Sequence, residues 1–158
     1  MRRYSLSKKT LEALYTEDLS EFRKLINEEN INWVDKDGRP VIFHAILDGS
    51  QFMLLEALKF HPDLNLKDNL GWTALHYAAQ NFLIEIAKIL VDKGADVNGK
   101  DNFGNSILWR AVFASKGRGE MIKLLLENGA KPDEANSSGV TPLKLAVSIS
   151  NYNISQYF

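Results

Sequence analysis

The sequence predicts a stack of repeated helical units, because three separate landmarks recur along the chain with a common period. The first landmark is a four-residue turn ending in glycine, which occurs as Asp35-Lys36-Asp37-Gly38, Asp68-Asn69-Leu70-Gly71, Asp101-Asn102-Phe103-Gly104 and Asn136-Ser137-Ser138-Gly139. The glycines are 33, 33 and 35 positions apart. The second landmark is a helix start shortly after each glycine, and the third is a segment represented by Gly94-Ala95-Asp96-Val97-Asn98. Agreement of three landmarks on one period indicates a repeat architecture.

The turn and the helix start of each unit have the residue types that these elements require. Asp-x-x-Gly forms a turn, because aspartate bonds nearby backbone amides and glycine tolerates a positive φ. Thr73, Ser106 and Thr141 then stand at helix N-caps, where a hydroxyl accepts an unpaired backbone N–H. Pro142 follows at a first helical position, which proline favours. Because the turn acids lie a whole repeat apart, we expect them to hold their turns rather than bind calcium.

The second helix of each unit is indicated by apolar residues at helical spacing. In one unit these are Ile84, Ala87, Leu90 and Val91, and in the next they are Met121, Leu124 and Leu125. Gly94 and Gly129 are expected to end these helices in the left-handed conformation. Because one helix pair cannot bury its own apolar stripe, neighbouring units are expected to stack into a continuous core.

The two ends of the chain depart from the repeat. Upstream, Leu11 and Leu14 indicate one helix, and Leu19, Phe22, Leu25 and Ile26 indicate another, which together predict an N-terminal helical cap. The third unit has two extra residues within Ser115–Gly119, which predicts a wider loop between its helices. In the last unit only Asn153–Phe158 are left for a second helix, so this segment is either a minimal cap or a truncated repeat.

These features resemble the ankyrin repeat family, whose period is about 33 residues and whose first helix begins with TPLHxA. Thr73-Ala74-Leu75-His76-Tyr77-Ala78-Ala79 matches that signature best, and Thr141-Pro142-Leu143 keeps its first half. The resemblance implies an all-α ankyrin-repeat solenoid with two antiparallel helices and a projecting β-turn per repeat. The expected units are a cap at 1–34, an ankyrin-like repeat at 35–67, repeats at 68–100 and 101–135, and an incomplete capping repeat at 136–158.

Composition and charge exclude several functional classes. The 158-residue chain has 19 basic and 20 acidic residues, and its net charge of −1 gives no broad positive field for nucleic acid. It has no apolar run of ~18 residues that could span a membrane, and no apolar signal segment near its start. Without cysteine it forms no disulfide and no thiolate metal site. We expect a monomeric, cytoplasmic protein that binds neither nucleic acid nor membrane.

The sequence contains no recognisable catalytic, cofactor or metal site. The histidines His44, His61 and His76 do not share the i, i+4 spacing of helix-borne metal ligands. Gly117-Arg118-Gly119 completes no phosphate-binding motif, and no Gly-x-Ser-x-Gly nucleophile elbow occurs. The resemblance implies that His76 bonds neighbouring groups and ties repeats together. Trp109 replaces this histidine in the next unit, where its indole N–H is expected to do part of the same task.

A binding surface is implied by the resemblance, because turn tips and first helices of such stacks form a concave face that holds partners. The candidate partner-binding residues on this face are Arg39, Trp72, Tyr77, Phe103, Arg110 and Phe113. Aromatic residues and arginine dominate interface energetics, and each costs ~2 kcal/mol or more when truncated at a hot spot. A structural interpretation competes for two of them: Trp72 packs against a neighbouring turn, or Tyr77 fills a partly buried position.

The sequence therefore predicts a non-enzymatic protein–protein binding module that needs no cofactor. One alternative is a bacterial immunity protein that binds and neutralises a cognate toxin. Another is a spacer or regulatory fragment of a larger ankyrin protein. An enzyme that uses His44 or His76 with nearby carboxylates is the least favoured interpretation, because no partnered nucleophile is recognisable.

Overall fold

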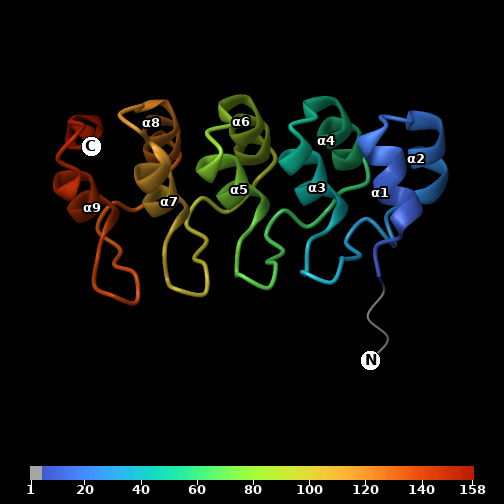
Figure 1. Ribbon diagram of the computed structural model, residues 1–158, viewed down its shortest axis with the longest axis horizontal. Helices are drawn as coiled ribbons and strands as arrows, with labels where there is room; N and C mark the ends of the chain where they lie inside the picture. The colour runs from blue at the N-terminus through green and yellow to red at the C-terminus, as the bar shows by residue number, and fades with distance from the viewer. Residues whose placement is uncertain (1–4) are drawn as a thin grey trace.

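The computed structural model describes residues 5–158, and over this range the chain forms helices joined by turns, without a β-strand. The helices are α1 (Lys8–Tyr15), α2 (Leu19–Leu25), α3 (Val41–Asp48), α4 (Gln51–Leu58), α5 (Ala74–Gln80), α6 (Ile84–Asp92), α7 (Ile107–Ala114), α8 (Glu120–Glu127), α9 (Pro142–Ser148) and the 3₁₀ helix η1 (Ile154–Tyr157). In Figure 1 the helix pairs stand side by side from α1 and α2 to α9, and the turns between pairs project from one edge. The predicted all-α solenoid is confirmed for the described residues. The boundaries of the individual units stay predictions.

The first helices begin at the predicted N-caps. Ser106 Oγ accepts the backbone N–H of Trp109 at 3.1 Å, and Thr141 Oγ1 accepts that of Lys144 at 3.0 Å. At Thr73 the cap is reciprocal, because the Thr73 N–H donates to Nδ1 of His76 at 3.1 Å. Each start therefore satisfies backbone donors that would otherwise stay unpaired.

The turns are held in two ways, by their own acids and by one another. Asp68 Oδ1 accepts the backbone N–H groups of Leu70 and Trp72 at 2.8 and 2.9 Å. The same two bonds recur at the other turns, where the acceptors are Asp35, Asp101 and Asn136. Backbone bonds then join each turn to the next; these are Asn69 N to Asp37 O, Asn102 N to Leu70 O, and Ser137 N to Phe103 O, at 2.9, 3.1 and 3.0 Å. The acids hold the turns as predicted, and the turns form a continuous ladder.

One apolar core runs from the cap to η1. Equivalent positions of successive first helices are fully buried, as at Ile42, Leu75 and Leu108. The cluster begins with cap residues such as Phe22 and ends with Ile154. Each first helix contacts the next one along the stack, so the apolar stripe of one unit is covered by its neighbours, as expected for a solenoid.

The inserted loop and η1 pack on each other. The hydroxyl of Tyr157 donates to the carbonyl oxygen of Gly117 at 2.9 Å across 40 residues of sequence. The rings of Tyr152 and Tyr157 lie so close to Gly117 and Gly119 that a Cβ on either glycine would collide with them. The short η1 thus covers the third unit in place of a full second helix.

A glycine is required at position 71 for two separable reasons. Its φ is +77°, and a Cβ would lie 2.7 Å from the backbone nitrogen of Asn102 in the next turn. We expect Gly71→Ala to lower the free energy of unfolding by about 2 kcal/mol in urea titrations. Gly139→Ala is the matched control, because Gly139 has φ +75° and nothing within 4 Å. It should cost only about 1 kcal/mol for the left-handed backbone; equal losses would contradict the close approach of the turns.

Candidate functional site

A continuous series of ring and cation contacts joins the first helices of the second and third repeats. The rings of Trp72 and Tyr77 have centroids 5.0 Å apart, and the guanidinium of Arg110 lies 4.7 Å from the Trp72 ring. Arg110 also lies 5.6 Å from the Trp109 ring, which stacks on Phe113 at 5.4 Å with 13° between planes. Four of the six candidate residues therefore belong to one contact series. Among residues 5–158, neither Arg39 nor Phe103 makes such a ring contact.

Each of the first three turn acids lies against the side chain nine positions later in the sequence. Tyr77 Oη donates to Asp68 Oδ2 at 2.5 Å, and Arg110 Nη2 pairs with Asp101 Oδ2 at 2.5 Å. His44 Nε2 lies 3.1 Å from Asp35 Oδ2 without a well-aligned hydrogen bond. The pairing ends at the fourth turn, where the acid is replaced by Asn136 and the residue nine positions later is Leu145. These pairs tie the turns to the first helices and fix the side chains that stand between them.

Burial and these pairs together determine the protonation states of Tyr77 and Asp101. Burial, and then the hydrogen bond to Asp68, raise the pKa of Tyr77, so its phenol remains a neutral donor at pH 7. At Asp101, burial favours the protonated form, but Arg110 and Asn105 outweigh it and lower the pKa of the carboxyl. Both members of the Asp101–Arg110 pair are therefore charged, and the net charge of the pair is zero.

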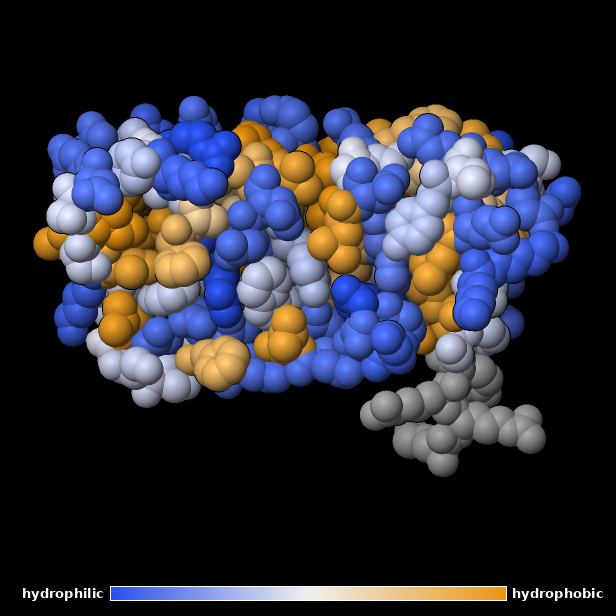
Figure 2. Space-filling model, viewed as in Figure 1, coloured by the Kyte–Doolittle hydropathy of each residue, from blue (hydrophilic) through white to orange (hydrophobic). Residues whose placement is uncertain are grey.

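Four apolar side chains remain exposed around this framework. Phe103 and Leu70 occupy equivalent turn tips and are 65% and 54% exposed, and Phe113 and Leu47 occupy equivalent places on α7 and α3 at 58% and 44%. Figure 2 shows this side of the molecule, where apolar surface recurs along the turns and first helices between hydrophilic stretches. We call the surface formed by Arg39, Leu47, Leu70, Trp72, Phe103 and Phe113 the turn–helix face.

The candidate residues thus fall into two groups. Phe103 and Phe113 are open to solvent, whereas Tyr77 is buried and the Arg110 side chain is only 17% exposed. Trp72 is half-buried and packs against the core. Leu47 and Leu70 were not among the six candidates, although the repeat register already places Leu70 at a turn tip and Leu47 on the same side of a first helix.

The guanidinium of Arg39 pairs with the two acids of its own turn. Its Nε lies 3.2 Å from Asp35 Oδ2, and its Nη2 pairs with Asp37. Burial lowers the pKa of Arg39, but Asp35 and Asp37 outweigh it, so the net pKa is raised and the guanidinium is charged.

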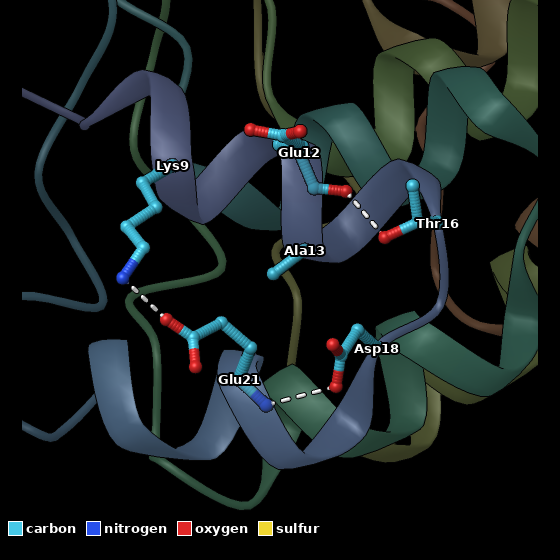
Figure 3. A pocket seen from close by; sticks show the side chains of 6 residues that line it. All are labelled: Lys9, Glu12, Ala13, Thr16, Asp18 and Glu21. Carbon is cyan, nitrogen blue, oxygen red and sulfur yellow. Dashed lines mark hydrogen bonds and ion pairs between the residues drawn. The ribbon is translucent and has the colours of Figure 1, made fainter.

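The N-terminal cap contains a cavity of about 280 Å³ between α1 and α2 (Figure 3). Most of its polar side chains already have partners: Lys9 Nζ lies 2.6 Å from Glu21 Oε1, and Asp18 accepts the backbone N–H of Glu21 at 3.0 Å. Thr16 donates to the carbonyl oxygen of Glu12 at 2.8 Å. Of these contacts, the Lys9–Glu21 ion pair joins the two cap helices.

The histidines do not converge on a site. His76 is fully buried, and burial lowers its pKa to about 4, so it is a neutral hydrogen-bond acceptor at its own helix cap. Within residues 5–158 no three His, Asp or Glu side chains are placed together to hold a metal ion. The same range contains no helix long and apolar enough to cross a membrane.

Trp109 does not replace the hydrogen bond of His76. Its indole Nε1 is buried and has no hydrogen-bond partner among the described residues, so the prediction for its N–H is wrong. The Trp109 ring instead packs against Phe113 and under Arg110. The N-cap of α7 does not need this ring, because Ser106 supplies the acceptor itself.

Comparison with known proteins identifies the repeats. A family model described as "Ankyrin repeats (3 copies)" matches residues 11–101, and one described as "Ankyrin repeats (many copies)" matches residues 107–158. Similar proteins include human BCL-6 corepressor-like protein 1, 36% identical over 81% of this chain, and alpha-latrotoxin-Lg1a of Latrodectus geometricus, 34% identical over 80%. The E3 ubiquitin-protein ligase hecd-1 of Caenorhabditis elegans is 38% identical over 53%. The matches cover only 7%, 10% and 3% of these relatives.

Proposed function

Because the chain belongs to the ankyrin repeat family, whose repeats are protein–protein interaction modules, we propose that it binds a protein partner through the turn–helix face, without catalysis. The observation that carries this proposal is the exposure of apolar side chains at equivalent places of different units. Phe103 and Phe113 are more than half exposed, although the core of the stack does not need them. Exposed apolar side chains that recur on one face are typical of an interaction surface.

The framework beneath this face supports tight binding. The ladder of backbone bonds between turns and the pairs between turn acids and first helices hold the face in one arrangement. A face that is ordered before binding loses little conformational entropy on association. In this proposal Phe103, Phe113 and part of Trp72 contact the partner, whereas Tyr77 and Arg110 position them.

We expect the double substitution Phe103→Ala and Phe113→Ala to weaken partner binding at least tenfold and to lower the melting temperature only slightly, because both rings are exposed and only the stacking of Phe113 on Trp109 is lost. Peptides selected from a displayed random library against the wild-type chain serve as probes, and calorimetry gives their dissociation constants for each variant. The matched control is Phe52→Ala with Leu55→Ala, which removes side chains of 50% and 42% exposure from α4. Peptides that lose affinity only for the α4 variant would contradict the proposal.

The narrower roles gain no support from the inserted loop. A loop reserved for a dedicated partner such as a toxin would be open, but Gly117 and Gly119 are covered by Tyr152 and Tyr157 of the same chain. The relatives named above differ in their described activities, so they indicate a shared scaffold rather than a shared partner. The immunity and spacer roles, the cytoplasmic location and the monomeric state stay predictions.

A further inference from the structure

We propose that the cavity between the first and second turns is a specificity pocket that takes one basic side chain, a lysine or an arginine, of the protein partner. This inference rests on the proposed function, since the pocket adjoins the turn–helix face. The cavity has a volume of about 220 Å³ and is lined by Asp37, Arg39, Asp68, Asn69, Leu70 and Tyr77. Pockets for small-molecule ligands usually measure about 300–1,000 Å³, so this cavity suits a single side chain better than a metabolite.

The charge of the lining favours a cation. Two carboxylates, Asp37 and Asp68, line the cavity with one cation, Arg39, which also pairs with Asp35 below it. Lys36, the nearest other cation in sequence, is exposed and does not line the cavity. A basic group that enters would offset the excess negative charge. A carboxylate or phosphate would be repelled by the two acids, and Arg39 is already paired with Asp35 and Asp37.

The two carboxylates differ in what they can still accept. Asp68 uses Oδ1 for the backbone of its turn and Oδ2 for the phenol of Tyr77, which is a neutral donor. Asp37 binds Arg39 through Oδ2, and its Oδ1 has no hydrogen-bond partner among the described residues. Its side chain is 46% exposed. Asp37 Oδ1 is therefore the acceptor that a guest ammonium or guanidinium would reach.

The apolar wall suits the aliphatic part of such a side chain. Leu70 is half-exposed and lines the cavity together with Tyr77. Lysine and arginine pack their methylene groups along apolar surface while the charged end stays at a polar site. A cation near the Tyr77 ring gains further from the ring's electron density. A norleucine side chain would contact the apolar wall but would give Asp37 no hydrogen-bond donor.

The test uses blocked amino acids as probes in an NMR titration of the full ¹⁵N-labelled chain. N-acetyl-lysine methylamide and N-acetyl-arginine methylamide are expected to shift the backbone amides of Asp37, Arg39 and Leu70 in a saturable manner. The norleucine and glutamate equivalents should bind at least fivefold more weakly. Equal shifts with norleucine, stronger shifts with glutamate, or no saturable shift with either basic probe would overturn the proposal.

Two variants locate the binding. Asp37→Asn keeps the shape of the lining and removes one charge, so it should weaken the basic probes at least fivefold. Asp133→Asn removes the same charge from an exposed place in a distant loop and should leave binding unchanged. Leu70→Ala should also weaken the binding of the basic probes. Because the Leu70 side chain is exposed, this substitution should leave the chain folded. Unchanged affinity in both pocket variants would contradict the assignment. The library peptides test Phe103 and Phe113 in a separate measurement. A negative result for the pocket would therefore not contradict the proposed binding face, which is judged by the peptide affinities alone.

Discussion

Replacing Asp101 with alanine is expected to lower the free energy of unfolding by about 3 kcal/mol, because a fully buried carboxylate there satisfies groups on two elements. Its Oδ1 accepts the backbone N–H groups of Phe103 and Asn105, each at 2.9 Å. Its Oδ2 pairs with Arg110. Alanine would leave two turn amides without their acceptor and Arg110 without its counter-ion. Urea titrations at pH 7 measure the loss.

Asp101→Asn separates these two contributions, because the protein already contains an asparagine in the same role. At the fourth turn, Asn136 Oδ1 accepts the backbone N–H groups of Ser138 and Val140, both at 3.0 Å. We therefore expect Asp101→Asn to retain the turn and to lose about 2 kcal/mol, because the amide nitrogen that takes the place of Oδ2 cannot accept from Arg110. An alanine variant within ~0.5 kcal/mol of the wild type would show that the turn does not depend on this acid.

The pH dependence of the same variant has a definite sign. The folded state lowers the pKa of Asp101, so the unfolded state binds the proton more readily as the solution is acidified. The stabilisation is complete well above the carboxyl's unfolded pKa of about 3.9 and is lost as pH falls through the lower folded value. The difference between wild type and Asp101→Asn should therefore shrink in acid.

Local chemistry explains why much of the fold could be predicted from the sequence. A hydroxyl at Ser106 or Thr141 acts within three residues, so its role as an N-cap is visible in the sequence itself. The same holds for Asp68, whose carboxylate bonds the backbone of its own turn. Because each unit repeats these short-range rules, the register of the whole stack followed from them.

The face was harder to predict because its residues are arranged by contacts between elements. Tyr77 and Arg110 have residue types that suit an interface, yet each folds back on its turn acid nine positions earlier. The spacing of nine recurs three times in the sequence, but its meaning depends on how the turn lies against the first helix. The contact of Tyr157 with Gly117 joins residues 40 positions apart. No equivalent contact occurs in the other described units, so the repeat pattern could not predict it.

Acidification from pH 6.5 to pH 4 is expected to reduce the free energy of unfolding by about 3 kcal/mol through His76. Burial lowers the pKa of His76 to about 4 in the folded chain, against an ordinary value of 6.5. Between these values the unfolded state takes up a proton that the folded state resists, so stability falls as pH falls. Protonation would also remove Nδ1 as acceptor for the N–H of Thr73. Burial lowers the pKa of His44 as well, which adds to the loss in the same direction.

Two histidine variants isolate this contribution in unfolding titrations from pH 7.5 to pH 4. His76→Gln keeps a side-chain oxygen that can accept the N–H of Thr73, as in a capping box, but it has no titratable group, so its stability should vary less with pH than that of the wild type. His61→Asn is the control: His61 is exposed and has φ +52°, a conformation that asparagine adopts readily, so its profile should follow the wild type. Above about pH 5 the residual slope of His76→Gln then reports His44, whereas below it carboxylates with a lowered pKa, such as Asp101, also contribute. A slope in His76→Gln equal to that of the wild type would mean that the acid sensitivity arises elsewhere, and that folding does not change the affinity of the His76 imidazole for a proton.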